Sequence, residues 1–191
     1  MRIFAGTARG RFVSAPKDFE LRPTTDRVRL ALFNALGPAV TDCTFLDVFS
    51  GSGSVGLEAL SRGAKKAVFI DSQKVCIDTV KATAQAFGFD EGTYEAWRAD
   101  HQRGLNTLAG RGLKFDLIFL DPPYNAGLGI VTLRLLLQLQ LLAEHEQSRI
   151  ILEHAGADPS PQVPGLALYR RYDHGAASLS VYGREGATLA A

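Results

Sequence analysis

Asp121-Pro122-Pro123-Tyr124 is the segment of this 191-residue chain whose residue types point most directly to chemistry. Two successive prolines lack N–H groups and have a fixed φ, so the chain leaves the preceding apolar run in a rigid, extended turn. The Asp121 carboxylate and the Pro122 carbonyl can then both accept hydrogens from one planar NH₂ group. Tyr124 offers a flat face on which a nucleobase can stack. Taken alone, the segment would be a proline-rich loop with a buried tyrosine.

An exocyclic amine on a nucleobase is a poor nucleophile, because its lone pair is delocalised into the ring. Two acceptors on its hydrogens favour the pyramidal geometry that is needed to attack a sulfonium methyl group in line. Together with the glycine-rich turn at residues 47–56, the segment therefore predicts methyl transfer to a base amine, with Asp121, Pro122 and Tyr124 as the catalytic residues.

A glycine-rich turn spans residues 47–56, between a predicted strand and a predicted helix. Gly51 and Gly53 let the backbone turn tightly and approach a ligand, while Gly56 allows the helix to pack closely on the strand. The pattern G-x-G-x-x-G by itself fits a dinucleotide site and an S-adenosylmethionine site equally well. A glycine-rich turn that binds nothing is a third interpretation.

Of three carboxylates near this turn, Asp47 and Asp100 favour the methyl donor, and Asp71 fits either cofactor. Asp47 lies inside the end of its strand and can accept a hydrogen bond from the amino group of a cationic amino-acid ligand, whereas an anion does not help to bind a pyrophosphate. Asp71 follows Gly51 by twenty residues and stands where a ribose-binding carboxylate belongs, with a surface carboxylate as the alternative. Asp100 can accept from the adenine amino group or, equally, cap a helix over 101–108.

The elements that must position these residues alternate between strands and helices from residue 44 onward. Apolar runs predict strands at 44–49, 67–70, 94–99, 115–120 and 150–152, and helical spacing predicts helices at 55–62, 74–87, 101–108 and 133–142. Such alternation indicates an α/β fold, an open, doubly wound parallel sheet covered on both faces, in which ligands bind beyond the carboxyl ends of the strands. Two further runs, 166–172 and 178–182, predict a C-terminal antiparallel hairpin, which brings the sheet to seven strands.

The first forty residues predict a small basic extension. Runs at 2–4 and 11–13 suggest a hairpin, 16–23 an irregular connection, and Thr24 or Thr25 the cap of a helix that stops at 37–38. Residues 1–30 carry seven basic and three acidic side chains, a balance of +4, whereas the whole chain carries +1. This asymmetry suggests an arm that faces an anion. Candidate contacts to RNA phosphates are Arg9, Arg11, Arg22, Arg27 and Arg29, each with a solvated arginine as the alternative.

Composition excludes several classes of protein. The 46% hydrophobic and 21% charged residues do not fit a disordered chain, a collagen or a coiled coil. Cys43 and Cys76 cannot build a disulfide framework, and the four scattered histidines lack metal-ligand spacing, so no metal is expected. We see no signal peptide and no apolar run long enough to cross a bilayer, so we expect a cytoplasmic protein with no membrane partner.

Several strings of the sequence resemble one family of enzymes. The turns around Asp47 and Asp121 resemble those of amino-methyltransferases that act on nucleobases. More narrowly, the chain is similar over about residues 1–183 to the bacterial 16S ribosomal RNA guanine-N2 methyltransferases of the RsmD type, through the strings at 2–6, 9–11, 21–29, 31–34 and 56–63. Leu30, Ser50 and Asp71 depart from the usual family residues, which are Glu, Ala and Glu.

This resemblance implies a Rossmann-like class I fold and S-adenosylmethionine as cofactor, with S-adenosylhomocysteine as product. It further implies that the substrate is one guanine of 16S rRNA in an assembled or nearly assembled small subunit. We expect the cofactor to be bound by Asp47, Phe49, Gly51, Gly53, Asp71 and Asp100. We expect the substrate to be bound by Arg9, Arg11, Arg22 and Arg27. We expect a monomer with an extension at 1–40, a catalytic domain at 41–183 and a flexible tail at 184–191. Alternatives are an N6-adenine methyltransferase acting on DNA or RNA, a nicotinamide-dependent oxidoreductase and a non-catalytic assembly factor that binds RNA.

Overall fold

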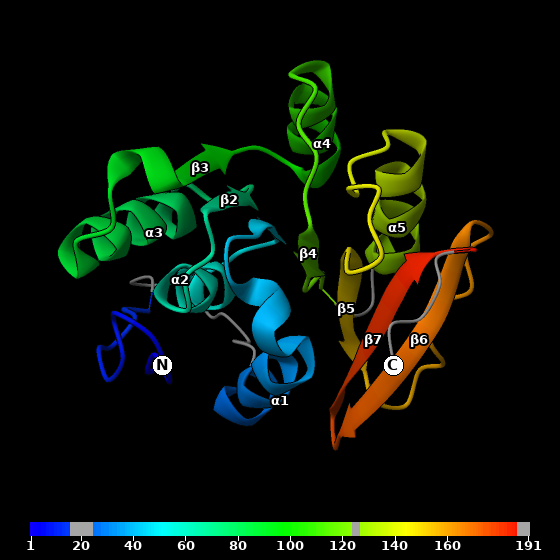
Figure 1. Cartoon of the computed structure of the whole chain (residues 1–191), viewed down its shortest axis with the longest axis horizontal. Coiled ribbons are helices and arrows are strands. Elements are labelled where there is room, and N and C mark those ends of the chain that lie inside the picture. The colour runs from blue at the N-terminus through cyan, green and yellow to red at the C-terminus, as the bar shows by residue number, and fades with distance from the viewer. Residues whose placement is uncertain (16–24, 124–126, 187–191) are drawn as a thin grey trace.

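A computed structural model describes residues 1–15, 25–123 and 127–186 of the chain, and its centre is a single seven-stranded sheet (Figure 1). The strands are β1 (Thr44–Val48), β2 (Lys66–Asp71), β3 (Tyr94–Arg98), β4 (Leu117–Leu120), β5 (Arg149–Ala155), β6 (Leu166–His174) and β7 (Ala177–Arg184). The helices are α1 (Asp26–Leu36), α2 (Ser54–Ser61), α3 (Lys74–Phe87), α4 (His101–Gly110) and α5 (Leu128–Gln138), with short 3₁₀ turns η1 (Gly37–Val40) and η2 (Glu91–Thr93).

The order of the strands is β3-β2-β1-β4-β5-β7-β6. The first five are parallel to one another, and β7 runs antiparallel to both β5 and β6. The strand order reverses beside β1, where the chain returns from β3 at one edge to β4 on the other side of β1. This is the place at which a doubly wound sheet forms its ligand crevice. The predicted doubly wound sheet with a C-terminal antiparallel hairpin is therefore confirmed.

Two apolar layers cover the two faces of the sheet. Phe45, with residues from α1, α2 and α3, belongs to one buried cluster, and its neighbour Leu46, with residues from α4 and α5, belongs to the other. The same alternation runs through β2, β4 and β5 because successive side chains of a strand point to opposite faces. It follows that Asp47, two residues after Phe45, points to the face covered by α1, α2 and α3.

Some predicted boundaries are corrected by the structure. The helix expected at 133–142 begins at Leu128, after a left-handed Gly127, and ends at Gln138. Leu142 instead forms an isolated parallel bridge with Phe115, so this pair extends the sheet at the amino end of β4. At the other end of the chain, the small hairpin expected at 2–4 and 11–13 is confirmed: Arg2 and Phe12 form an antiparallel bridge, and the backbone N–H groups of Ile3 and Val13 donate to the carbonyls of Arg11 and Met1, each at 2.9 Å.

The N-terminal segment is fastened to α2 by buried hydrogen bonds. Glu58 is fully buried and accepts from the backbone N–H groups of Phe4 at 2.8 Å and Ala5 at 3.1 Å, and from Nε of Arg62 at 2.7 Å. Ser61 Oγ accepts from the N–H of Ala8 at 2.9 Å. Because a helical carboxylate supplies the acceptors for this segment, its backbone is held against the core.

Arg29, one of the arginines considered for phosphate binding, is also part of this attachment. Its side chain is 0% exposed, lies over the ring of Phe4, and donates to the carbonyl of Arg2 and to Asp26. Burial lowers the pKa of Arg29, with partial compensation from Asp26 and Glu58. A side chain with no exposed surface is not available to a phosphate, so the expectation for Arg29 is wrong.

Across the described ranges, no helix has both the length and the apolar content that a bilayer crossing requires. The same ranges contain no group of three or more His, Cys, Asp or Glu side chains that could hold a metal ion.

Candidate active site

The glycine-rich turn takes a backbone path that few sequences allow. Three of its residues have positive φ: Phe49 at 64°, Gly51 at 53° and Gly53 at 74°. For Phe49 such a value is uncommon, and backbone strain of this kind is typically found at functional sites. Gly53 is the N-cap of α2 and provides no side chain to cap it. The turn therefore presents backbone groups and the N-terminus of α2 at the carboxyl end of β1.

The side chain of Asp47 stabilises this turn. Its side chain is 2% exposed, and Oδ2 accepts a hydrogen bond of 2.9 Å from the backbone N–H of Gly56. Burial raises the pKa of Asp47 to about 8, although the hydrogen bond from Gly56 opposes the shift. The structure thus assigns Asp47 a role in closing the turn, and a contact with a bound amino group remains a prediction.

Two glycines of the motif are required by close packing. A Cβ atom on Gly53 would lie 2.6 Å from Cγ2 of Val80, and one on Gly56 would lie 2.3 Å from Cε1 of Phe69. Contacts this short do not occur without displacement of the neighbouring atoms. The third glycine of the motif therefore serves helix–strand packing, as the sequence pattern predicts.

Asp71 and Asp100 lie at the same edge of the sheet, with part of their hydrogen-bonding capacity already used. Asp71 ends β2 and accepts from the backbone N–H groups of Gly51 and Gln73, each at 2.8 Å. Asp100 is exposed and caps α4 by accepting from the N–H of Arg103 at 2.9 Å, a hydrogen bond that lowers its pKa. The capping alternative for Asp100 is thus observed. Further contacts from either carboxylate to a ligand remain predictions.

Phe49 and His101 join the turn after β1 to the turn after β3. Their ring centroids are 5.3 Å apart at an angle of 36°. Within the part of the chain that the structure describes, Nε2 of His101 and Oγ of Ser50 are buried without a hydrogen-bond partner. Burial also lowers the pKa of His101. These two polar atoms lie beside a turn whose backbone conformation requires glycine. Both features fit a site in which a polar, aromatic cofactor supplies the missing hydrogen-bond partners.

The sequence reasoning missed this role of His101. It considered the four histidines only as metal ligands, and it considered Ser50 only as a departure from the family pattern. Its position in the sequence could have indicated the role, because His101 directly follows Asp100, the carboxylate after the third strand.

The double-proline turn begins next to the glycine-rich turn. Strand β4 is paired with β1, Val48 is opposite Leu120, and the N–H of Asp121 donates to the carbonyl of Val48 at 3.4 Å. Asp121 is partly buried and Pro122 is buried, whereas Pro123 is exposed. Tyr124, the fourth residue of the motif, lies outside the described residues. The backbone therefore brings Asp121 to the carboxyl edge where Asp47 and Asp71 also end their strands.

A small cavity of about 130 Å³ lies beside this turn. Pro122 and Pro123 form one side, the first residues of α5 another, and the end of β5 with the following loop the rest. Glu153 and His154 from β5 line it and are 4% and 8% exposed. Nε2 of His154 lies 2.7 Å from Oγ of Ser180, and burial lowers its pKa. Sequence reasoning did not select these two residues, because they read as the end of an apolar strand.

The predicted substrate arginines do not gather in one place. Arg11 stacks on Phe87 with 4.6 Å between guanidinium and ring centroid, and it donates to the carbonyl of Ala86. Both partners end α3, a helix of 14 residues. Since α3 begins at the carboxyl edge, Arg11 is about 20 Å from that edge. Arg9 is exposed on the same N-terminal segment.

Arg27 has a different position from these two. It is exposed in the first turn of α1, while the other end of α1 continues into η1 near the start of β5. Arg27 is therefore on the carboxyl side of the sheet, where the site lies. Arg22 lies outside the described residues.

Comparisons with known proteins agree with this geometry. A family model described as Conserved hypothetical protein 95 matches residues 1–183. Ribosomal RNA small subunit methyltransferase D of Escherichia coli strain K12 is 36% identical over 188 residues, which cover 97% of this chain and 90% of that protein.

Solved structures show the same fold. The Escherichia coli protein yhhF superposes with a TM-score of 0.83 and is 34% identical, over 98% of this chain and 99% of that chain. SMU.776, solved in complex with S-adenosylhomocysteine, has a TM-score of 0.65 and is 17% identical, over 82% of this chain and 48% of that chain. At 17% identity, the likeness to SMU.776 concerns the fold alone.

Proposed function

The chain belongs to the family described as Conserved hypothetical protein 95, the family of ribosomal RNA small subunit methyltransferase D, and on this premise we propose that it methylates the exocyclic N2 amine of a guanine in 16S rRNA. It is an S-adenosylmethionine-dependent methyltransferase that acts on ribosomal RNA, and the guanine N2 atom is the finer part of the proposal. The single observation that carries it is the junction of the two turns, where the N–H of Asp121 donates to Val48, directly before Phe49.

The donor side is built from the glycine-rich turn and the carboxylates around it. S-adenosylmethionine, when bound, supplies an electrophilic methyl group on a sulfonium. Asp47 would accept from its amino group, Asp71 from the ribose hydroxyls and Asp100 from the adenine amine, using lone pairs that their backbone contacts leave available. Gly51 and Gly53 would let the backbone approach the ligand, and Phe49 with His101 would supply an aromatic wall.

The acceptor side is the double-proline turn. Asp121 and the carbonyl of Pro122 would hold the two hydrogens of the amine, so that its nitrogen lone pair faces the methyl group. As the amine nitrogen forms its bond to the methyl carbon, the bond from that carbon to the sulfonium sulfur would break, leaving S-adenosylhomocysteine, and Asp121 would receive the proton that the amine loses. Tyr124 would stack on the base. These groups act by orientation and charge, which together account for a large part of many enzymatic rate enhancements.

The substrate is expected to be the small ribosomal subunit in the cytoplasm. We expect the folded rRNA to present the target base, which leaves its stack to reach the site. Arg22 and Arg27 would contact phosphates near the target base, and Arg9 and Arg11 would contact phosphates about 20 Å away. We expect the enzyme to act as a monomer.

The test is methylation of small subunits that lack the modification, with tritiated methyl donor and identification of the labelled nucleoside. The proposal expects N2-methylguanosine in 16S rRNA. Label in N6-methyladenosine would replace the guanine assignment with the adenine alternative. Absence of label, together with retained binding to subunits, would instead favour a non-catalytic assembly factor.

A further inference from the structure

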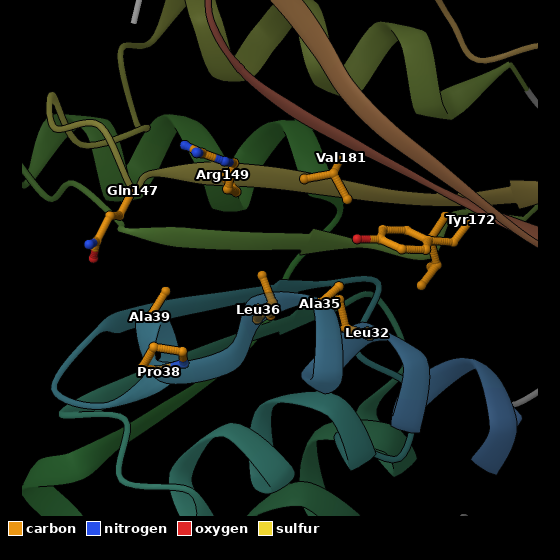
Figure 2. A pocket seen from close by; sticks show the side chains of 10 residues that line it. Leu32, Ala35, Leu36, Pro38, Ala39, Gln147, Arg149, Tyr172 and Val181 are labelled. Carbon is orange, nitrogen blue, oxygen red and sulfur yellow. The ribbon is translucent and has the colours of Figure 1, made fainter. Parts of the chain in front are cut away.

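A groove of about 360 Å³ separates α1 from the C-terminal strands (Figure 2). One wall is the side of α1 and η1, the other is the sheet of β5, β7 and β6. Figure 2 shows Leu32 and Ala35 of α1 facing Tyr172 and Val181, while Pro38 and Ala39 lie opposite Gln147 and Arg149. The remaining lining residues are Leu36 and Leu179.

The charge that lines this groove is positive. Among the described residues that line it, none is acidic and Arg149 is the only charged one. The ion pairs found within the described ranges do not include Arg149. Arg149 is held by stacking on Tyr169, 4.3 Å from guanidinium to ring centroid, and by donation to the carbonyls of Glu146 and Ser148. The cation is thus fixed in place and not neutralised by a carboxylate.

A second arginine lies beside Tyr172, one of the lining residues. Arg170 is exposed on β6, and its guanidinium lies 5.8 Å from the ring centroid of Tyr172. The groove therefore has mainly apolar walls, one aromatic side chain, a lining cation at Arg149 and a second cation beside Tyr172. This combination suits a planar aromatic group attached to an anion, which is the chemistry of a nucleotide.

The groove is also close to the proposed active site. Leu179 of β7 is paired with Glu153, and the neighbouring Leu152 is paired with Leu120, the last residue before Asp121. Three strand spacings separate β4 from β6, a distance of about 14 Å. One or two nucleotides of extended RNA span that distance, and α1 carries Arg27 at the end that faces the site.

We propose that this groove binds an unpaired nucleotide of the rRNA that flanks the target guanine. The base enters between α1 and the sheet and contacts Tyr172, and the adjoining phosphates face Arg149 and Arg170. The proposal rests on the proposed function, because it takes ribosomal RNA as the substrate. It adds a site that lies outside the two turns and whose charge and shape would select the orientation of the RNA.

Photocrosslinking identifies the occupant directly. Ala35 lines the groove and is exposed, whereas its exposed neighbour Asn34 does not line it. With benzoylphenylalanine at position 35, we expect a crosslink to 16S rRNA in small subunits, and a much weaker one from position 34. A crosslink from position 35 to a ribosomal protein, or equal yields from both positions, would overturn the proposal.

A variant that blocks the groove provides a second test of the proposal. Ala35→Trp places a large side chain in the groove. We expect it to raise KM for small subunits about tenfold, which corresponds to the loss of one stacked base. Its Kd for the methyl donor and its thermal stability should equal those of the control variant Asn34→Trp. An unchanged KM would refute the groove as an RNA site. Wild-type N2-methylation in the same assay reports separately on the proposed function, so the two failures are distinguishable.

Discussion

Oδ2 of Asp47 accepts a hydrogen bond of 2.9 Å from the backbone N–H of Gly56, so the carboxylate near the end of β1 holds the first turn of α2. Residues 47–56 are thereby closed into a loop that contains Gly51 and Gly53. The same carboxylate is buried, which raises its pKa to about 8. Asp47 is therefore at once a brace and an ionisable group at the predicted cofactor site.

Binding of the methyl donor is expected to release a proton from Asp47. At pH 7 a carboxyl group with a pKa of about 8 is mainly protonated, and a nearby ammonium group favours its ionised form, which lowers the pKa in the complex. Calorimetry in buffers of different ionisation enthalpy counts the protons. Wild type should release more than Asp47→Asn at pH 7, and equal counts would show that the carboxyl does not face the amino group.

Gly56→Ala is expected to damage both packing and cofactor binding. The new Cβ would lie 2.3 Å from the Phe69 ring, so the helix must move away from β2 and pull the glycine-rich turn with it. We expect a loss of about 1–3 kcal/mol in the free energy of unfolding and weaker donor binding. Gly110→Ala is the control, because a Cβ there meets nothing within 4 Å. Denaturant titration and calorimetry would contradict the prediction if the two variants behaved alike.

Glu58→Ala is expected to detach the N-terminal segment. The substitution removes the acceptor for Phe4 and Ala5 and leaves Arg62 without its partner, so we expect a loss of about 3 kcal/mol, as for a broken buried ion pair. Glu58→Gln keeps one carbonyl acceptor and should lose less. Limited proteolysis should cleave the Ala variant within residues 1–15 first. Equal resistance of wild type and Glu58→Ala would refute this role.

Asp121→Asn is expected to lower turnover about 100-fold or more, because it removes a charged acceptor from the amine, while donor affinity stays within about twofold. Asp116→Asn, a carboxylate at the opposite end of the same strand, is the matched control. Asp116 accepts from the backbone N–H of Thr44 at 2.6 Å and pairs with Nε2 of His145 at 2.6 Å, so its contacts lie at the amino end of β4, away from the proposed site. Single-turnover methylation of small subunits measures both variants, and full activity in Asp121→Asn would remove the proposed chemistry.

Much of the fold could be predicted from the sequence because each strand has an apolar run and a helix that follows it. Helix α3 was predicted at its observed limits, where Gly88 provides the left-handed cap. The limits of α5 were not, since the apolar residues run on through Leu142 and hydropathy does not distinguish a buried helix from a buried bridge.

The candidate site likewise has a part that local sequence patterns predict and a part that they do not. Local patterns predicted Asp47, Gly51, Gly53 and Asp71, which lie at one edge of the sheet. The burial of Arg29, the position of Arg11 at the far end of α3, and the pairing of Phe49 with His101 depend on contacts between distant segments. No local pattern encodes these contacts.

The most direct measurement is the modification state of 16S rRNA in cells that lack this protein. Mass spectrometry of rRNA fragments should show one guanine without its N2-methyl group, restored by the wild-type protein and not by Asp121→Asn. An unchanged set of N2-methylguanosines in the deletion strain, or full restoration by Asp121→Asn, would contradict the account.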